Sequence, residues 1–273
     1  MGGAAHEGEA ERVRGVTPGL SRDYATRTAE RQAAFVLPHL RPGMQLLDLG
    51  AGPGTITIGL ARAVMPGRVI GVDLDATHVE TATALAAAEG VPNATFQQGD
   101  ALALPFEDAS FDAAFENDVL VHISSNAIRA VEEVRRVLKP GALFAARDAT
   151  TAVWGGQTDE MRRFDDLFEA WHRGRGSDIH LGSRLPAILG AAGFTDLVVS
   201  VTADVKQASD EVREHARIMT FLLDGPVGAA SLSAGLIDES GLSRIRSSIA
   251  GWGTRPDAFF ANVHVEVIGR QPE

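Results

Sequence analysis

The amino-acid sequence predicts a mostly parallel, doubly wound α/β sheet, and three observations lead to that fold class. Short apolar segments of strand length alternate with longer amphipathic segments over residues 45–146. Breaks that contain Gly or Pro separate these segments, as expected where helices end. The first apolar segment leads directly into a Gly-rich turn, which is typical of the first strand and helix of such a sheet.

The expected elements follow one another in a regular order. A first helix is expected over Ser21–Leu40, where apolar residues recur every three or four positions, and Arg41-Pro42-Gly43 ends it. Strands separated by helices form parallel sheets with helices on both faces. The alternating part is expected to contain strand Gln45–Leu49, helix Thr55–Met65, strand Val69–Val72, helix Ala76–Glu89, strands Thr95–Gln98 and Asp112–Phe115, helix Asn126–Leu138 and strand Ala142–Ala146.

The second half of the sequence is less regular. We expect a helix over Gln157–Arg173 with its apolar and aromatic residues on one face, followed by a flexible Gly-containing segment. In the last strand valines alternate with polar residues, so Asn262, His264 and Glu266 are expected to form an exposed face. The other elements expected here are helix Arg184–Ala192, strand Asp196–Val201, helices Glu211–Leu223 and Leu242–Ile249, and strand Phe260–Ile268.

Composition and charge exclude several classes of protein. The 273 residues include no cysteine, which excludes disulfides, thiolate nucleophiles and cysteine-ligated metals. The formal net charge of −11 disfavours nucleic-acid partners, which attract basic proteins. Met1–Leu20 lacks an apolar stretch and no run of about 18 apolar residues occurs, so we expect no secretory leader, no membrane span and a cytoplasmic location. The eight histidines form no His-x-x-x-His pair, so no metal site is expected.

The Gly-rich turn is the first functional signal. It reads Gly50-Ala51-Gly52-Pro53-Gly54-Thr55 and lies between an expected strand and an expected helix. Glycines let the backbone turn tightly and approach a ligand, and the helix N-terminus offers free N–H groups. The turn therefore indicates a nucleotide-like ligand, although a purely structural strand–helix turn is an alternative.

Two acidic residues strengthen this interpretation. Asp73 follows the second strand, 23 positions beyond Gly50, where the doubly wound fold places the ribose hydroxyls of a nucleotide. Asp100 follows the third strand at the same edge of the sheet, placed to accept a hydrogen bond from an adenine amine. A lone Asp is about as often a cap or a turn residue, so the inference depends on the order and spacing of the two.

Four segments together resemble the class I S-adenosylmethionine-dependent methyltransferases. They are LDLGAGPGT (47–55), VIGVDLD (69–75), GDALALPFEDASFD (99–112) and RRVLKPGAL (135–143), in the family's order and roughly its spacing. The resemblance covers about residues 21–148; its one departure is Ala142, where the family has a second glycine after Lys-Pro-Gly. It implies a Rossmann-like sheet of seven strands, the last antiparallel, with a helical lid.

The resemblance also implies a division of the chain and a set of cofactor-binding residues. Residues 1–40 would form N-terminal lid helices, 41–150 the S-adenosylmethionine-binding core, 151–183 a lid insert, and 184–273 the rest of the sheet with inserted helices. Tyr24, the only tyrosine, would close over the carboxylate of the cofactor. The other implied contacts are Gly50, Ala51, Gly52, Gly54 and Thr55 for the methionine part, Asp73 and Leu74 for the ribose, Gly99, Asp100 and Ala101 for the adenine, and Asn117, Val119 and His122 for the sulfonium end.

The same residues fit two rival functions less well. A nicotinamide-binding turn needs a third glycine where this sequence has Thr55, and Thr28 stands where the Tyr-x-x-x-Lys pair of short-chain dehydrogenases needs lysine. An NAD-dependent oxidoreductase is therefore a distant alternative. A non-catalytic cofactor-binding protein of the same fold is another, because fold does not fix function.

Catalytic candidates come from the expected acceptor side of the sheet. Methyl transfer mainly needs alignment and exclusion of water, and a base is needed only when the acceptor loses a proton. Glu116, at the end of the fourth strand, is the first candidate base, and Tyr24 and His180 are further candidates. Glu116 could instead cap a turn or pair with an arginine, and His180 could be an exposed loop residue; Asp148 also points to this side.

Two C-terminal segments narrow the expected function. LPAILGAAGF (185–194) and GWGTRPDAFFANVHVEVIGR (251–270) resemble microbial small-molecule methyltransferases related to the menaquinone/ubiquinone type, which include natural-product enzymes that methylate carbon on indole rings. The resemblance implies methylation of a small, largely apolar metabolite, such as C-methylation of an indole or related aromatic ring. Quinone-type C-methylation and small-molecule O- or N-methylation stay open as alternatives. A homodimer is plausible.

Overall fold

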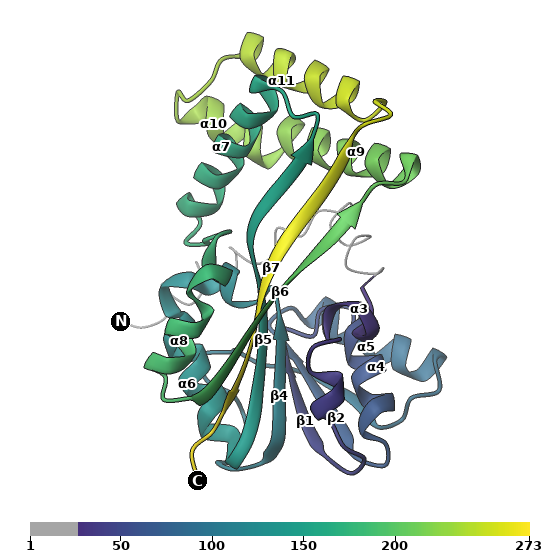
Figure 1. Cartoon of the computed structure of the whole chain (residues 1–273), viewed down its shortest axis with the longest axis vertical. Helices are drawn as coiled ribbons and strands as arrows, with labels where there is room; N and C mark the ends of the chain where they lie inside the picture. The colour runs from purple at the N-terminus through teal and green to yellow at the C-terminus, as the bar shows by residue number, and fades with distance from the viewer. Residues whose placement is uncertain (1–26) are drawn as a thin grey trace.

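The computed structural model describes residues 27–273, so Tyr24 and the first part of the helix expected over Ser21–Leu40 lie outside the described residues. Seven strands form one sheet in the order β3-β2-β1-β4-β5-β7-β6 (Figure 1). All neighbours are parallel except β7, which is antiparallel to both β5 and β6. The expected doubly wound sheet with one antiparallel last strand is confirmed. The strands are β1 Gln45–Leu49, β2 Arg68–Asp73, β3 Ala94–Gln98, β4 Phe111–Asn117, β5 Leu138–Gly155, β6 Thr195–Lys206 and β7 Phe259–Arg270.

Helices cover both faces of the lower part of the sheet, because the strands there are apolar on both sides. One face packs against α3 (Ala29–Gln32), α4 (Thr55–Val64) and α5 (Ala76–Ala88), and the other against α6 (Ala127–Val137) and α8 (Leu185–Ala191). Two hydrophobic clusters result, one on each face of the sheet. These layers hold the carboxyl ends of the parallel strands at one edge, where such sheets bind ligands.

Three long strands carry a second group of helices. β5, β6 and β7 extend beyond the parallel strands, and their far ends meet α7 (Asp159–Gly174), α9 (Ser209–Asp224), α10 (Pro226–Ser233) and α11 (Glu239–Trp252) (Figure 1). We call these four helices the helical subdomain. They enclose a hydrophobic cluster of their own, which includes Phe164, Leu222 and Trp252. The molecule therefore has a sheet core and a helical subdomain joined by three strands.

Several expectations about individual elements were wrong. The helix expected over Ser21–Leu40 is interrupted in its described part: α3 ends at Gln32, and Leu37–His39 is a separate 3-10 turn around Pro38, which cannot continue a helix. β5 continues nine residues past Ala146, because its backbone stays paired with β7 as far as Gly155, although several of its side chains there are exposed. Helix α10 was not expected, since its small residues show little apolar periodicity.

The expected exposed face of the last strand is also wrong. His264 and Glu266 are each 1% exposed, because Arg147 of β5 and polar residues of β6 lie against them. Two other short elements complete the described chain: the 3-10 segments η2 (Leu120–Asn126) and η3 (Leu181–Arg184). No helix among residues 27–273 is long and apolar enough to cross a membrane.

Candidate functional site

The Gly-rich turn after β1 is fixed by hydrogen bonds to β2. The N–H groups of Gly50 and Ala51 donate to the Val72 carbonyl at 2.7 and 3.0 Å. Gly50, Gly52 and Gly54 all have positive φ, which glycine adopts without the strain that a side chain would add. A side-chain carbon at Gly50 would collide with Val119, whereas one at Gly52 would meet no atom within 4 Å. The turn therefore packs tightly against η2 at Gly50 and is open above Gly52.

Asp73 lies beside this turn at the end of β2. One carboxylate oxygen accepts the Gly52 N–H at 2.8 Å, and the other accepts the Asp75 N–H at 2.9 Å and lies 3.2 Å from His78 Nδ1. These contacts hold the carboxylate in one orientation, 12% exposed. The structure thus brings Asp73 and Gly52 together, as the spacing predicted, with the carboxylate still reaching the surface. Leu74, the other expected ribose contact, follows it and is partly buried.

The third strand places its acidic residue at the same edge. Gly99 donates its N–H to the Asp73 carbonyl at 3.0 Å, which sets the turn after β3 beside the end of β2. One oxygen of Asp100 accepts the Leu102 N–H at 2.9 Å, so Asp100 is a turn residue as well as a ligand candidate. Asp100 and Ala101 are both partly buried.

Asp48, in β1, was missed by the sequence analysis. It is 3% exposed, and Thr57 Oγ1 of α4 donates a hydrogen bond to it at 2.5 Å. Burial raises the pKa of Asp48 to about 7, despite this hydrogen bond. Its place in the LDLGAG segment, two residues before Gly50, is the signal that could have identified it.

The end of β4 carries the residues expected at the sulfonium end. Asn117 is 8% exposed, and Val119 contacts the Gly-rich turn at Gly50. Asp118, between them, has a φ of 55°, a conformation that costs energy in residues other than glycine and often marks functional sites. His122, in η2, is exposed and its ring lies 6.3 Å from that of His172 in α7. Val119 therefore lies at the turn, Asn117 two residues before it at the end of β4, and His122 faces the helical subdomain.

Glu116 is completely buried beneath η2. Its two oxygens accept the N–H groups of Val119 and Arg147, each at 3.1 Å. Asp148 is also completely buried, accepts the Val121 N–H at 3.3 Å, and has one oxygen without a hydrogen-bond partner. Burial raises the pKa of both carboxyls well above the usual range, and the neighbouring charge of Asp148 raises that of Glu116 further. The pair ties η2 to the ends of β4 and β5.

His180, the other described base candidate, lies beside β5. Its Nδ1 lies 2.6 Å from the Thr150 carbonyl oxygen, and its Nε2 is 3.5 Å from Glu169 of α7. The side chain is 48% exposed. The loop that carries it is held to η2, because Asp178 donates its N–H to the Val121 carbonyl at 2.9 Å. His180 thus lies between β5 and α7, and Tyr24 lies outside the described residues.

The sequence analysis did not predict a cluster of charged side chains that lies beside the end of β4, next to the candidate site. We call it the polar cluster; it comprises Asp118, Arg147, Asp204, His264 and Glu266. Arg147, 1% exposed, donates to Asn117 at 2.8 Å and to Asp204 at 3.0 Å. Burial alone would raise the pKa of Asp118, but His264 and Arg27 lower it well below its usual value. The alternation of polar residues in β7 was a signal for the cluster, although it was interpreted as solvent exposure.

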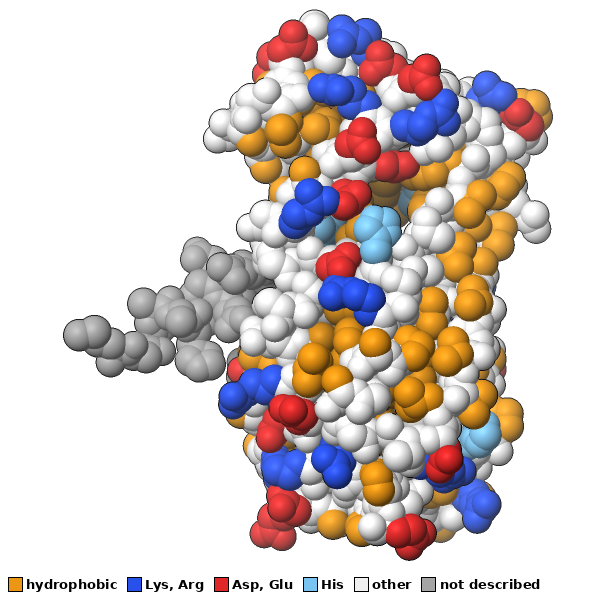
Figure 2. Space-filling view, turned by 60° about the vertical axis from the view of Figure 1, so that its left-hand side comes forward, with side chains coloured by type: hydrophobic (Ala, Val, Ile, Leu, Met, Phe, Trp, Pro, Cys, Tyr) orange, Lys and Arg blue, Asp and Glu red, His pale blue; other side chains and the backbone are white. Residues whose placement is uncertain are grey.

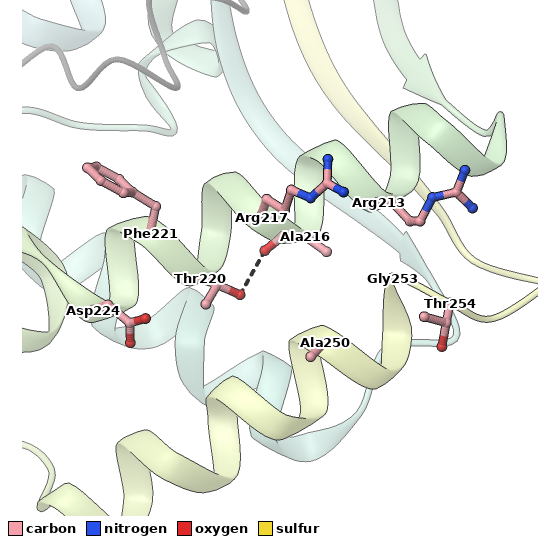
Figure 3. A pocket seen from close by; sticks show the side chains of 9 residues that line it. All are labelled: Arg213, Ala216, Arg217, Thr220, Phe221, Asp224, Ala250, Gly253 and Thr254. Carbon is pink, nitrogen blue, oxygen red and sulfur yellow. Dashed lines mark hydrogen bonds between the residues drawn. The ribbon is translucent and has the colours of Figure 1, made fainter.

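A surface groove lies in the helical subdomain, away from the candidate site. It has a volume of about 460 Å³ and runs between α9 and α11, lined by Phe221, Thr220 and Gly253 among others (Figure 3). None of the residues predicted from the sequence as site residues lines it.

Comparisons with known proteins agree with this geometry. The family profile described as "Methyltransferase domain" matches residues 46–141, from β1 through the start of β5. Residues 46–141 form a methyltransferase domain. The domain is of the S-adenosylmethionine-dependent class, and it holds every cofactor contact expected from the resemblance except Tyr24.

Three proteins illustrate what the chain resembles around this methyltransferase domain. A probable methyltransferase of Aspergillus luteorubrus is 38% identical over 131 residues, 45% of this chain and 46% of the relative. The demethylmenaquinone methyltransferase of Symbiobacterium thermophilum is 37% identical over 114 residues, 41% of this chain and 45% of the relative. The YcgJ protein of Bacillus subtilis shares the fold, with a TM-score of 0.60, 22% identity and coverage of 89% and 99%. The chain thus spans about half the length of these two curated relatives.

The methyltransferase domain fits its cofactor at the contacts described. The turn leaves space above Gly52, which a bound ligand requires, and packs against Val119 at Gly50, which holds the turn in place. The Asp73 carboxylate is oriented at the second strand end, as ribose binding requires. Asp100 and Ala101, which the resemblance assigns to the adenine, follow Gly99, whose N–H donates to the Asp73 carbonyl.

Proposed function

We propose that the protein transfers a methyl group from S-adenosylmethionine to a small, largely apolar metabolite. The observation that carries this proposal is the joint placement of the Gly50–Thr55 turn, Asp73 and Val119 at one edge of the sheet. S-adenosylmethionine, when bound, supplies a methyl group on a positively charged sulfur, which becomes neutral when the methyl group leaves. The chain then mainly has to hold the acceptor in line and exclude water.

The helical subdomain supports an apolar acceptor. Phe168 and Trp171 of α7 are partly buried against its cluster, and the Phe168 ring contacts His172 at 4.5 Å between centroids. Burial lowers the pKa of His172 to about 3, so its ring is neutral near pH 7. Figure 2 shows the surface hollowed at the waist between the helical subdomain and the sheet core, with apolar and histidine side chains near the hollow. An aromatic metabolite such as an indole, methylated on carbon, suits these surroundings.

A base is part of the proposal only for acceptors that lose a proton. Glu116, Tyr24 and His180 are the proposed candidates. Glu116 would have to release backbone N–H groups that it now accepts, whereas His180 has an exposed ring. Quinone-type C-methylation is the second candidate, since the Symbiobacterium relative is named a demethylmenaquinone methyltransferase, and O- or N-methylation is a third. A cytoplasmic location and a homodimer complete the proposal, on the sequence alone.

Product analysis tests the reaction. The purified protein is incubated with deuteromethyl-labelled S-adenosylmethionine and a panel of indole diketopiperazines, reduced naphthoquinones and phenolics, and products are followed by mass spectrometry. A labelled indole supports natural-product tailoring, whereas a labelled quinol or phenol selects one of the alternatives. Tight binding of S-adenosylhomocysteine without product would mean that the acceptor lies outside the panel, and no binding of either cofactor form would overturn the proposal.

The ribose assignment has its own test. Because Asp73 supplies a charged hydrogen-bond acceptor, Asp73→Ala should weaken S-adenosylhomocysteine binding by about tenfold or more in calorimetry. Asp108→Ala, at an acidic side chain that is 78% exposed on the surface, serves as the control and should leave the affinity unchanged. Equal affinities of the two variants would show that Asp73 does not bind the ribose.

A further inference from the structure

Strands β5, β6 and β7 form one continuous face of the sheet, which starts at the polar cluster beside the end of β4. Residues directly opposite each other in neighbouring strands point to the same side of a sheet, as do alternate residues of one strand. His264, Asn262 and Phe260 of β7 therefore share a face. The register adds two rows to it: Ala152, Asn262 and Asp204 in one, and Trp154, Phe260 and Lys206 in the next.

Along the strands, this face changes from polar at the candidate site to aromatic at the helical subdomain. Its near end is the polar cluster, which Gln32 of α3 joins through a 3.4 Å contact with Asp204. Its far end is aromatic: the Trp154 and Phe260 rings lie 4.7 Å apart and contact His215 of α9. Helices α3 and α9 thus flank the face at its two ends, and the partly exposed Asp204, Asn262 and Phe260 lie between them.

Asp204 combines access with proximity to the reacting end. Its side chain is 28% exposed, whereas Arg147 and His264, which it contacts, are each 1% exposed. One guanidinium group joins Asp204 to Asn117, since two nitrogens of Arg147 donate to the two side chains. Asn117 is a residue that the family resemblance places at the sulfonium end. Asp204 is therefore a partly exposed carboxylate that Arg147 links to Asn117, the residue expected at the methyl donor.

We propose that the Asp204 carboxylate accepts a hydrogen bond from an N–H or O–H group of the methyl acceptor, while Phe260 and Trp154 cover its planar apolar part. This inference rests on the proposed methyl transfer and names the acceptor class for it. A strand rises about 3.3 Å per residue, so the aromatic row lies about 7 Å beyond the Asp204 row. That spacing suits a fused two-ring aromatic compound with a donor group at one edge. Asp204 selects the acceptor and takes no part in the transfer step.

Binding of two matched probes tests the proposal without turnover. The protein saturated with S-adenosylhomocysteine is titrated with 2-naphthol, which has a donor O–H, and with 2-methoxynaphthalene, which has none. The wild type should bind 2-naphthol about tenfold more tightly or better, because a hydrogen bond to a charged acceptor contributes that much. Asp204→Asn should reduce the ratio to about threefold or less, since the charge is lost while the contact with Arg147 can remain.

Matched variants separate recognition from damage to the fold. Asp196→Asn makes the same change at an exposed position of the same strand and should keep the wild-type ratio. Phe260→Ala should weaken both probes about equally, whereas Phe221→Ala, at a 49% exposed ring in the groove of Figure 3, should weaken neither. Asp204→Asn should also keep the wild-type affinity for S-adenosylhomocysteine.

The outcomes distinguish this inference from the proposed function. A wild-type ratio near one, or an unchanged ratio in Asp204→Asn, overturns the role of Asp204; the wild-type measurement decides even where a variant does not fold. Equal binding of both probes by Phe260→Ala and the wild type overturns the aromatic row. Loss of S-adenosylhomocysteine binding by the wild type would instead overturn the proposed function itself.

Discussion

Gly52 and Gly90 share a backbone requirement but differ in their surroundings. Both have positive φ, and a side-chain carbon at either would meet no atom within 4 Å. Alanine at either position should therefore cost about 1 kcal/mol of stability through the backbone alone. Only Gly52 lies in the proposed cofactor turn. Gly52→Ala should weaken S-adenosylhomocysteine binding at least about tenfold, whereas Gly90→Ala should not; calorimetry with thermal unfolding separates the two effects. Equal affinities would place the cofactor elsewhere.

Asp48 predicts a pH dependence of stability. Its pKa is raised in the folded state from 3.8 to about 7 by burial, so the folded state binds the proton more tightly than the unfolded state. The resulting stabilisation is complete below about pH 4 and is lost as the pH rises through about 7. Asp48→Asn cannot ionise, so its Tm relative to the wild type should rise between pH 5 and pH 8.

Thermal unfolding at several pH values checks this expectation. Asp108→Asn, at a surface side chain that is 78% exposed, is the control and should follow the wild-type curve. Parallel curves for Asp48→Asn and the wild type would mean that Asp48 keeps its ordinary titration in the folded protein.

The candidate site was predictable where chain order alone fixes it. Gly52, Asp73 and Asp100 follow three parallel strands, and such strands end at one edge whatever their side chains do. The polar cluster was not predictable in this way. Arg147, Asp204 and His264 come from three strands whose pairing register decides that they meet, and one sequence does not display that register.

At the scale of elements, helix α7 depends on its N-cap. Thr158 Oγ1 accepts the Met161 N–H at 3.2 Å and lies 2.6 Å from Ser248 Oγ of α11, so it also joins two helices of the helical subdomain. Thr158→Ala should cost about 1 kcal/mol of stability. Because α7 packs in the same hydrophobic cluster as Trp154 and Phe260, the KM for an acceptor should rise while S-adenosylhomocysteine binding stays unchanged. Thr151→Ala, at an exposed residue of β5, is the control for both measurements.

The lengths of the strands show what local sequence patterns omit. The expected strand Ala142–Ala146 matches only the part of β5 that lies among apolar neighbours. Beyond it, Arg147 and Asp148 are polar but completely enclosed, because β7 and η2 supply their partners. In the sequence alone, polar residues in such a strand have the pattern of a loop, because the partners that bury them are not visible there. The parallel strands β1 to β4 consist mainly of apolar residues and were predicted to within about two residues.

At the scale of the whole molecule, the two packed parts should open separately. The helical subdomain has its own hydrophobic cluster and meets the sheet core mainly through three strands, whereas β1 and β4 have neighbours on both sides. Hydrogen exchange should therefore be faster in α9–α11 than in β1 and β4. Added S-adenosylhomocysteine should slow exchange in the Gly50–Thr55 turn more than in α10. Uniform protection across both parts would show a single cooperative unit.

The separation of the hydrophobic clusters bears on how such a protein can diversify. Substitutions within the helical subdomain alter packing around Trp252 and Phe164 without touching the cluster beneath the Gly-rich turn. Mutational effects far apart in a structure are nearly additive, so adaptation of the one part places little burden on the other. Substitutions in these four helices can therefore change which metabolite is methylated during evolution, while the residues expected to bind the methyl donor stay the same.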